Sequence, residues 1–234
     1  MPAPIIIAHR ACRGHAPENT LAGIRAALRL GAQAIEFDVR CTRDGVPVLL
    51  HDATVDRTTD GAGELASLSR RQTLRLDAGG GERIPSLQNV LREVDGRVSL
   101  VVEIKQPGIE EAVLATVRRS KALDWCVVHS FQPGVVERVR RLEPRMPCSL
   151  LTDGRDVKDW GQLFAFVLSL GAQGVSIYHG AITPELVRQA HLRELRCATW
   201  TVNRREDVRR VAAAGVDAFT SDYPDRARRW LPKR

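Results

Sequence analysis

Pairs of charged side chains stand two residues apart inside two otherwise apolar runs of the chain. Glu36 and Asp38 interrupt the first run, and Glu103 and Lys105 end the second. Residues two apart on a β-strand share a face, so each pair is expected to project together. Because an unpaired carboxylate in so apolar a strand is costly, Glu36 and Asp38 require a compensating cation. The alternate residues are expected to face a layer of helices: Ile35, Phe37 and Val39.

A histidine is expected to reach these carboxylates through a β-hairpin. Asp44-Gly45 is a strong signal for a two-residue turn. With these two residues as the turn, the strand register sets His51 opposite Asp38, roughly 5 Å away between β-carbons. A register shift of one residue would turn His51 to the other face.

Three carboxylates without a thiolate form a ligand set for one hard divalent cation, Mg²⁺ or Ca²⁺, rather than zinc. His9 and Arg10 follow the first apolar run of the chain and are expected to face the same cavity as Lys105 and His51. A lysine and an arginine beside a divalent cation suit a phosphate ester. The two imidazoles can act as general base and general acid.

Eight short apolar runs alternate with amphipathic helical stretches over most of the chain. Such runs are typical of strands buried on both faces of a parallel sheet. A closed (β/α)₈ TIM barrel fits their number better than an open doubly wound sheet, and catalytic groups in such barrels lie at the C-terminal ends of the strands. The predicted strands are 5–9, 34–38, 99–104, 126–130, 148–152, 174–177, 197–202 and 218–221.

The segment from residue 40 to residue 85 is longer than one barrel connection should be. Glycines at 61, 63 and 79–81 mark loops within it. We interpret the segment as the hairpin followed by a small insertion at 53–84, within a single TIM-barrel domain over residues 1–234.

The composition excludes several classes of protein. The chain is 44% hydrophobic and 27% charged, as globular proteins are, and no apolar run is long enough to span a bilayer. The N-terminus lacks a secretion signal, and five scattered cysteines indicate reduced thiols. We therefore expect a cytoplasmic protein without stable membrane association.

The formal net charge of +7 suggests nucleic-acid binding as an alternative. Aromatic residues are only 5% of the chain, however, and its arginine clusters fall on helix-like segments far apart in the sequence. Solvated outer helix faces explain these clusters better than a nucleic-acid footprint does. A small anionic substrate, and no nucleic acid, is the expected partner.

Short motifs spread over nearly the whole chain resemble those of the glycerophosphodiester phosphodiesterases. Each motif alone is weak, but together, in this order, they are highly specific. They are Ala8-His9-Arg10, Pro17-Glu18-Asn19-Thr20, Glu36-x-Asp38-Val39, Asp44-Gly45, His51-Asp52, Arg57-Thr58-Thr59-Asp60-Gly61, Ile84-Pro85-Ser86-Leu87, Val102-Glu103-Ile104-Lys105, Trp200-Thr201-Val202-Asn203 and Thr220-Ser221-Asp222-Tyr223-Pro224.

The resemblance implies a TIM barrel of the phospholipase-C-like phosphodiesterase type. It also implies hydrolysis of glycerophosphodiesters, such as glycerophosphocholine or glycerophosphoethanolamine, to glycerol 3-phosphate and an alcohol with a divalent cation. Position by position, the metal ligands of the family correspond to Glu36, Asp38 and Glu103, its acid–base pair to His9 and His51, and its phosphate-binding residues to Arg10 and Lys105.

Ala11 departs from the family, which usually has glycine after His-Arg. If this position requires a positive φ, alanine strains the loop, and we expect a reduced fit rather than lost catalysis.

Other residues near the expected site have two interpretations each. Trp200 and Phe131 either wall the glycerol group of the substrate or fill the barrel. Glu18 and Asn19 either orient the His9-Arg10 pair or, for Asn19, cap the first helix. Asp52 is either a partner of a site residue or only the first residue of the insertion. Two further positions are ascribed mainly to structure: the Arg57-Thr58-Thr59 segment and His129.

Two other functions compete with this prediction. A phosphodiesterase acting on a larger lysophospholipid or sphingolipid would keep the same barrel and metal but would need an apolar entrance. A basic polyanion-binding protein would leave the aligned carboxylates unexplained.

Overall fold

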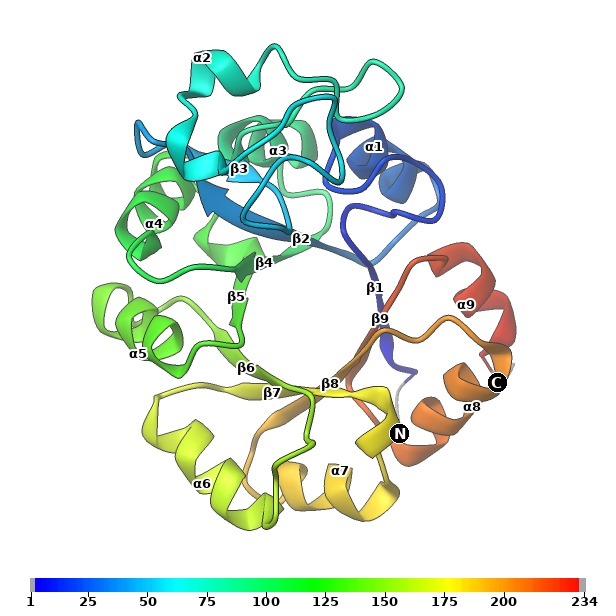
Figure 1. Cartoon of the computed structure of the whole chain (residues 1–234). Helices are drawn as coiled ribbons and strands as arrows, with labels where there is room; N and C mark the ends of the chain where they lie inside the picture. Colours follow the sequence, from blue (N-terminus) through cyan, green and yellow to red (C-terminus); the bar gives the residue numbers. More distant parts are fainter. Residues whose placement is uncertain (1–2, 232–234) are drawn as a thin grey trace.

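Eight parallel strands close into a barrel surrounded by helices in a computed structural model that describes residues 3–231 (Figure 1). Strand β1 pairs with β2 on one side and with β9 on the other, which closes the ring. The predicted TIM barrel is therefore confirmed. Residues 1, 2 and 232–234, at the two ends of the predicted domain 1–234, lie outside the described residues. The barrel strands are β1 (Ile5–Ala8), β2 (Ala34–Cys41), β4 (Ser99–Ile104), β5 (Cys126–Ser130), β6 (Cys148–Thr152), β7 (Gly174–Tyr178), β8 (Arg196–Trp200) and β9 (Ala218–Ser221).

Amphipathic helices cover the outside of the barrel. Thr20 caps α1 and Thr183 caps α7, each accepting a backbone N–H in the first helical turn. Helix α9 is an addition to the predicted elements and begins at Pro224. The covering helices are α1 (Leu21–Arg29), α3 (Leu87–Val94), α4 (Glu110–Arg119), α5 (Pro133–Leu142), α6 (Trp160–Ser169), α7 (Pro184–His191), α8 (Arg205–Ala214) and α9 (Pro224–Trp230).

As predicted, one face of β2 carries apolar side chains and the other carries carboxylates. Ile35, Phe37 and Val39 are fully buried in the main apolar core between the strands and the helices. Glu36 and Asp38 lie on the opposite face and line a cavity inside the barrel. The period of two along this strand therefore separates the residues that hold the fold from those available for chemistry.

The predicted register of the hairpin is wrong by one residue. Strand β3 (Pro47–Leu49) pairs with β2 so that Cys41 faces Pro47 and Val39 faces Leu49. The loop has three residues because Gly45 takes a φ of +73° and donates its N–H to the carbonyl oxygen of Thr42, a turn that ends in a left-handed glycine. Asp38 is consequently paired with Leu50 and not with His51. The N–H of Leu50 donates to the carbonyl oxygen of Asp38.

His51 still faces the cavity because β3 ends before it. The side chain of His51 lines the same cavity as Asp38, and Arg40 Nε donates to the carbonyl oxygen of His51 at 2.9 Å. The position of His51 thus depends on the chain after the strand rather than on strand pairing.

The segment after β3 has a small apolar core of its own. It contains η1 (Leu65–Ser67) and α2 (Arg70–Thr73) and lies outside the ring of strands, beside β3 and α3 (Figure 1). Val55, Leu65, Ala78 and Ile84 are buried together with residues of β3, separately from the main core.

All five cysteines are buried and unpaired, and burial raises the pKa of the Cys126 thiol to about 12. Every helix within residues 3–231 is too short or too polar to cross a bilayer.

Candidate active site

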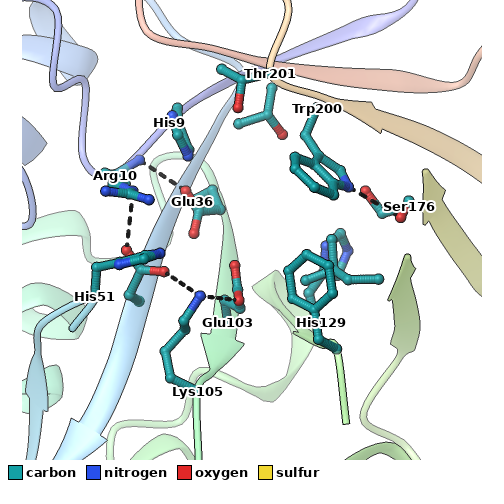
Figure 2. Close-up of a pocket in the computed structure, with 14 residues that line it drawn as sticks. His9, Arg10, Glu36, His51, Glu103, Lys105, His129, Ser176, Trp200 and Thr201 are labelled. Atoms are coloured by element: carbon teal, nitrogen blue, oxygen red, sulfur yellow. Dashed lines mark hydrogen bonds and ion pairs between the residues drawn. The ribbon is translucent and has the colours of Figure 1, made fainter. Parts of the chain in front are cut away.

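A cavity of about 190 Å³ opens at the C-terminal end of the barrel (Figure 2). Charged and aromatic side chains from most of the barrel strands, and from the segment after β3, surround it. The structure therefore brings the eight main predicted site residues together: His9, Arg10, Glu36, Asp38, His51, Glu103, Lys105 and Trp200.

The three carboxylates meet because β2 and β4 are neighbours. Asp38 and Glu103 are direct partners in the parallel register, and Glu36 stands two residues before Asp38 on the same face. One carboxylate oxygen from each residue lies within 4.8 Å of the others. Glu36 and Asp38 are only 6% and 1% exposed. The cluster is thus buried and strongly negative.

The burial of these groups changes their pKa values in different directions. Burial, together with the charges of Asp38 and Glu103, raises the pKa of Glu36. Burial and the charge of Asp38 likewise raise the pKa of Glu103. For Asp38, burial raises the pKa, but the nearby charges of Lys105, His51 and Arg10 outweigh it and hold the pKa below its usual value.

Two cationic side chains stand among the carboxylates. Lys105 Nζ lies 2.6 Å from Glu103 Oε1 and 3.5 Å from Asp38 Oδ1 (Figure 2). Arg10 Nε lies 3.6 Å from Asp38 Oδ2, and the Arg10 backbone N–H donates to Glu36 Oε2 at 2.8 Å. These cations supply the compensation that two carboxylates on one strand face were expected to need.

A buried carboxylate oxygen without a partner marks the centre of the cluster. Within the described residues, Glu36 Oε1 is buried and accepts no hydrogen bond. The surrounding donor set consists of carboxylate oxygens, the ligands that Mg²⁺ and Ca²⁺ prefer. The residues present therefore fit a hard divalent cation.

Two of the histidines that line the cavity, His9 and His51, have a carboxylate at the Nδ1 atom. His9 Nδ1 lies 2.6 Å from Asp222 Oδ1, and His51 Nδ1 lies 2.6 Å from Asp52 Oδ1. An acceptor at Nδ1 favours a proton there and leaves Nε2 as the nitrogen available to a ligand. Burial, the largest influence on His51, lowers its pKa. This arrangement is suited to proton transfer.

Asp222 is the partner that sequence reasoning missed. It follows β9 directly, and closure of the barrel places β9 beside β1, so that the N–H of His9 donates to the carbonyl oxygen of Ser221. Asn203 Nδ2 also donates to Asp222 Oδ2 at 2.8 Å. The signal available in the sequence was an acidic residue directly after the last predicted strand.

Glu18 and Asn19 support the cavity without lining it. Arg10 Nη1 donates to both carboxylate oxygens of Glu18, at 3.2 and 3.3 Å. Asn19 Nδ2 donates to Asp38 Oδ2 at 2.8 Å, and the N–H of Asp38 donates back to Asn19 Oδ1. Asn19 therefore contacts Asp38 through its side chain and Arg10 through its backbone N–H, which donates to the Arg10 carbonyl oxygen at 2.9 Å, and the cap of α1 is Thr20.

The position of Ala11 does require a positive φ. Arg10, Ala11 and Cys12 have φ values of 44°, 55° and 66°, a left-handed turn built without glycine. This turn directs the backbone N–H of Arg10 at Glu36. The strain anticipated for alanine at this position is thus located in the loop that carries a cavity residue.

Aromatic side chains form the wall opposite the carboxylates. The rings of Phe131 and Trp200 meet edge to face at 5.4 Å, and Trp200 Nε1 donates to the carbonyl oxygen of Ser176 at 3.2 Å (Figure 2). Lys105 Nζ lies 5.7 Å from the centre of the Phe131 ring. His129, which sequence reasoning ascribed mainly to structure, also lines the cavity, as do four residues to which it gave no site role: Leu151, Ser176, Thr201 and Thr220.

A parallel barrel with a charged cavity at the C-terminal ends of its strands defines a TIM-barrel enzyme. Residues 9–226 match the model of the glycerophosphoryl diester phosphodiesterase family. The chain belongs to this family, and it is therefore an enzyme of a hydrolytic class.

Individual relatives are similar to this chain over nearly its full length. A glycerophosphodiester phosphodiesterase of Caldanaerobacter subterraneus is 34% identical, covering 94% of this chain and 95% of the relative. An Oleispira antarctica phosphodiesterase, solved with the product sn-glycerol-3-phosphate, is 27% identical with a TM-score of 0.87, covering 97% and 96% of the two chains. A glycerophosphodiester phosphodiesterase structure from Agrobacterium tumefaciens is 27% identical with a TM-score of 0.84, covering 95% and 97%.

Proposed function

We propose that this enzyme hydrolyses glycerophosphodiesters to glycerol 3-phosphate and an alcohol with the help of one divalent cation. One observation carries the proposal: a single cavity holds three clustered carboxylates, two cationic side chains and two carboxylate-backed histidines. The relative solved with sn-glycerol-3-phosphate supports the same product. The activity is assigned to one domain, with the segment 53–84 as an insertion in it.

Glu36, Asp38 and Glu103 would hold the cation, because their oxygens lie close together and one of them lacks a partner. When bound, Mg²⁺ or Ca²⁺ supplies a positive charge that polarises the phosphoryl oxygens. Cation binding would also relieve the repulsion that raises the pKa of Glu36.

Arg10 and Lys105 would bind and orient the phosphate group. Both already face the carboxylates, and a guanidinium and an ammonium are the usual protein donors to phosphate oxygens. Trp200 and Phe131 form an apolar wall on the other side of the cavity, against which the carbon atoms of glycerol would pack. These contacts would place the phosphorus atom between the two histidines.

The two histidines would carry the protons. One would remove the proton from the glycerol 2-hydroxyl, whose oxygen attacks phosphorus. The other would protonate the departing alcohol oxygen as its bond to phosphorus breaks, and water would then open the cyclic phosphate to glycerol 3-phosphate. Asp222 and Asp52 would hold the two rings in the required tautomer. Phosphorus NMR during turnover tests this route, because direct attack by water produces no cyclic phosphate.

Release of glycerol 3-phosphate tests the function itself. The protein is incubated with glycerophosphocholine, glycerophosphoethanolamine or lysophosphatidylcholine, with Mg²⁺ or Ca²⁺ and then with excess EDTA. The released choline or ethanolamine is measured alongside glycerol 3-phosphate, because the lysolipid would yield an acylated glycerol phosphate instead. We expect turnover of the two glycerophosphodiesters, loss of it with EDTA and loss of it in Glu103→Gln, which keeps the side-chain shape. Activity that survives chelation would remove the cation from the proposal, and preference for the lysolipid would replace the substrate class.

We also propose that the enzyme works in the cytoplasm on diesters derived from lipids. The buried, unpaired cysteines are compatible with a reducing compartment. Fractionation of the producing cells, with glycerol 3-phosphate release as the assay, tests this location.

A further inference from the structure

Arg57 lies outside the barrel, in the segment after β3, yet it contacts two carboxylates that serve the cavity. Its Nε donates to Asp52 Oδ2 at 2.5 Å, and its Nη2 donates to Glu18 Oε1 at 2.7 Å. Within residues 3–231 these two carboxylates are the only hydrogen-bond partners of its side chain. One guanidinium therefore bridges two segments that are separate in the sequence.

Both of these carboxylates hold a residue that lines the cavity. Asp52 accepts at 2.6 Å from Nδ1 of His51, and Glu18 accepts from Nη1 of Arg10. The bridge thus connects the partner of a cavity histidine with the partner of a cavity arginine. A guanidinium suits this position because its planar fork presents separate donors in fixed directions, which an ammonium does not.

The segment around Arg57 is held in place by other bonds. The N–H of Val55 donates to the carbonyl oxygen of Gly63, and the hydroxyl of Thr59 donates to the carbonyl oxygen of Val55. Val55 itself is buried in the small apolar core of this segment. Loop anchoring, the interpretation favoured by the sequence, therefore does not require the side chain of Arg57.

The exposure of Arg57 separates a positioning role from a folding role. Its side chain is 49% exposed, and ion pairs at that exposure contribute little to stability. The hydrogen bond from Arg57 is also the largest influence that lowers the pKa of Asp52, to about 2. The guanidinium thus contacts the same carboxylate group that accepts from His51.

We propose that Arg57 is a positioning residue that orients His51 through Asp52 and Arg10 through Glu18. The kinetic side of this inference rests on the proposed function, whereas the orientation of His51 does not. Removal of the guanidinium is expected to free both cavity side chains, so that kcat falls and KM rises. Loss of an outer partner of a site residue typically costs about 10- to 100-fold in activity.

The kinetic test compares Arg57→Ala and Arg57→Lys with Arg71→Ala, a control on α2 whose exposed side chain has no hydrogen bond or ion pair in the described part of the chain. We expect both Arg57 variants to lose activity at an unchanged Tm, and the control to remain active. Free guanidinium, well below denaturing concentrations, should restore part of the activity of Arg57→Ala alone. Wild-type kinetics in both variants, or a loss of activity that follows a loss of Tm, would overturn the proposal.

An NMR measurement gives a readout that does not depend on turnover. In ¹⁵N-labelled protein, the imidazole signals of His51, assigned with His51→Gln, should show a protonated Nδ1 in the wild type. We expect these signals to shift or broaden in Arg57→Ala and not in Arg71→Ala. Unchanged signals would refute the positioning role even if activity fell. If the wild type has no activity but the His51 signals still shift in Arg57→Ala, the proposed function is refuted and the positioning role remains supported.

Discussion

The two ends of the barrel interior are built on the same strands but carry different side chains. At the C-terminal end, β2 and β4 present Asp38 and Glu103 to a charged cavity of about 190 Å³. At the N-terminal end, the same two strands present Ala34 and Val101 to a cavity of about 360 Å³. Several small residues line it, such as Ala198 and Ala218, so this end is left partly unfilled. The larger cavity is thus the one without a charged cluster at its centre.

The difference shows what makes a cavity an active site. Each charged group at the C-terminal end has neighbours of opposite charge or hydrogen-bond donors, and the cluster is costly to bury. The N-terminal end has polar lining residues too, such as the Arg196–Asp217 ion pair, but they stand beside an apolar patch of Ile7, Ala34 and Val101 rather than in a cluster of carboxylates. Backbone geometry is shared, so the chemistry resides in the side chains and in what orients them.

A matched pair of histidines gives the sharpest test of this comparison. His51 pairs with Asp52 at the C-terminal end, and His191 pairs with Asp217 near the N-terminal end, at 2.9 Å. We expect His51→Ala to lower kcat/KM by about 100-fold or more, because the proposed function makes His51 a general acid or base. His191→Ala should keep nearly full activity. Equal losses in the two variants, measured with glycerophosphocholine, would contradict the assignment of chemistry to one end.

Left-handed backbone occurs at both ends of the barrel. The turn 10–12 at the C-terminal end has positive φ values without glycine, and turns at the other end use glycines such as Gly31 and Gly171 as well as Lys121 and Glu194. Helix α1 packs closely against the turn, since a β-carbon on Gly23 would lie 2.0 Å from the carbonyl oxygen of Ala11. The turn that carries Arg10 therefore depends on a glycine in the neighbouring helix.

Gly23→Ala is expected to lower the free energy of unfolding by about 1–3 kcal/mol, because the new methyl group must displace the turn. Its kcat/KM should fall with it, since the turn carries Arg10. Gly134 in α5 is the control, because a β-carbon there meets nothing within 4 Å. Gly134→Ala should stabilise the protein by roughly 0.5–1 kcal/mol. Urea unfolding of the two variants measures these changes in the free energy of unfolding. An unchanged free energy in Gly23→Ala would show that the turn can move to accommodate the methyl group.

The sequence alone predicted the parts of the site that depend on strand alternation. Glu36 and Asp38 share a face because the period of a strand is two, and Asp38 meets Glu103 because consecutive barrel strands are neighbours. The hairpin register was wrong because the turn type depends on a single left-handed residue, Gly45, that the pattern does not reveal.

The partners of the histidines were harder to predict. Asp222 reaches His9 from 213 residues away, a contact that exists only when β9 closes the barrel against β1. Arg57 reaches Asp52 and Glu18 through an irregular segment whose path no periodicity defines. Regular elements are thus readable from the sequence, while contacts made through closure and loops are not.

His129 lies between the two ends, since its side chain lines both cavities. Burial lowers its pKa from 6.5 to about 4. Between pH 6.5 and pH 4 the imidazole of His129 is protonated in the unfolded chain but neutral in the folded protein. The free energy of unfolding therefore falls as the pH falls. We expect the stability of the wild type relative to His129→Gln to decrease by about 1–2 kcal/mol from pH 7 to pH 5. Urea unfolding at both pH values measures it, and a constant difference would show that His129 accepts a proton in the folded state.

Filling the N-terminal cavity is expected to have the smallest effect and to test the comparison from the other side. Ala218 on β9 lines this cavity, and Thr220, two residues further along the same strand, lines the catalytic one. Ala218→Val adds apolar contacts in unfilled space and should stabilise the protein by about 0.5–1 kcal/mol. Because no group of the proposed chemistry touches that space, kcat/KM should stay within about twofold of the wild type. A stabilised variant with greatly reduced turnover would mean that the two cavities are coupled, and the N-terminal end would then belong to the catalytic machinery.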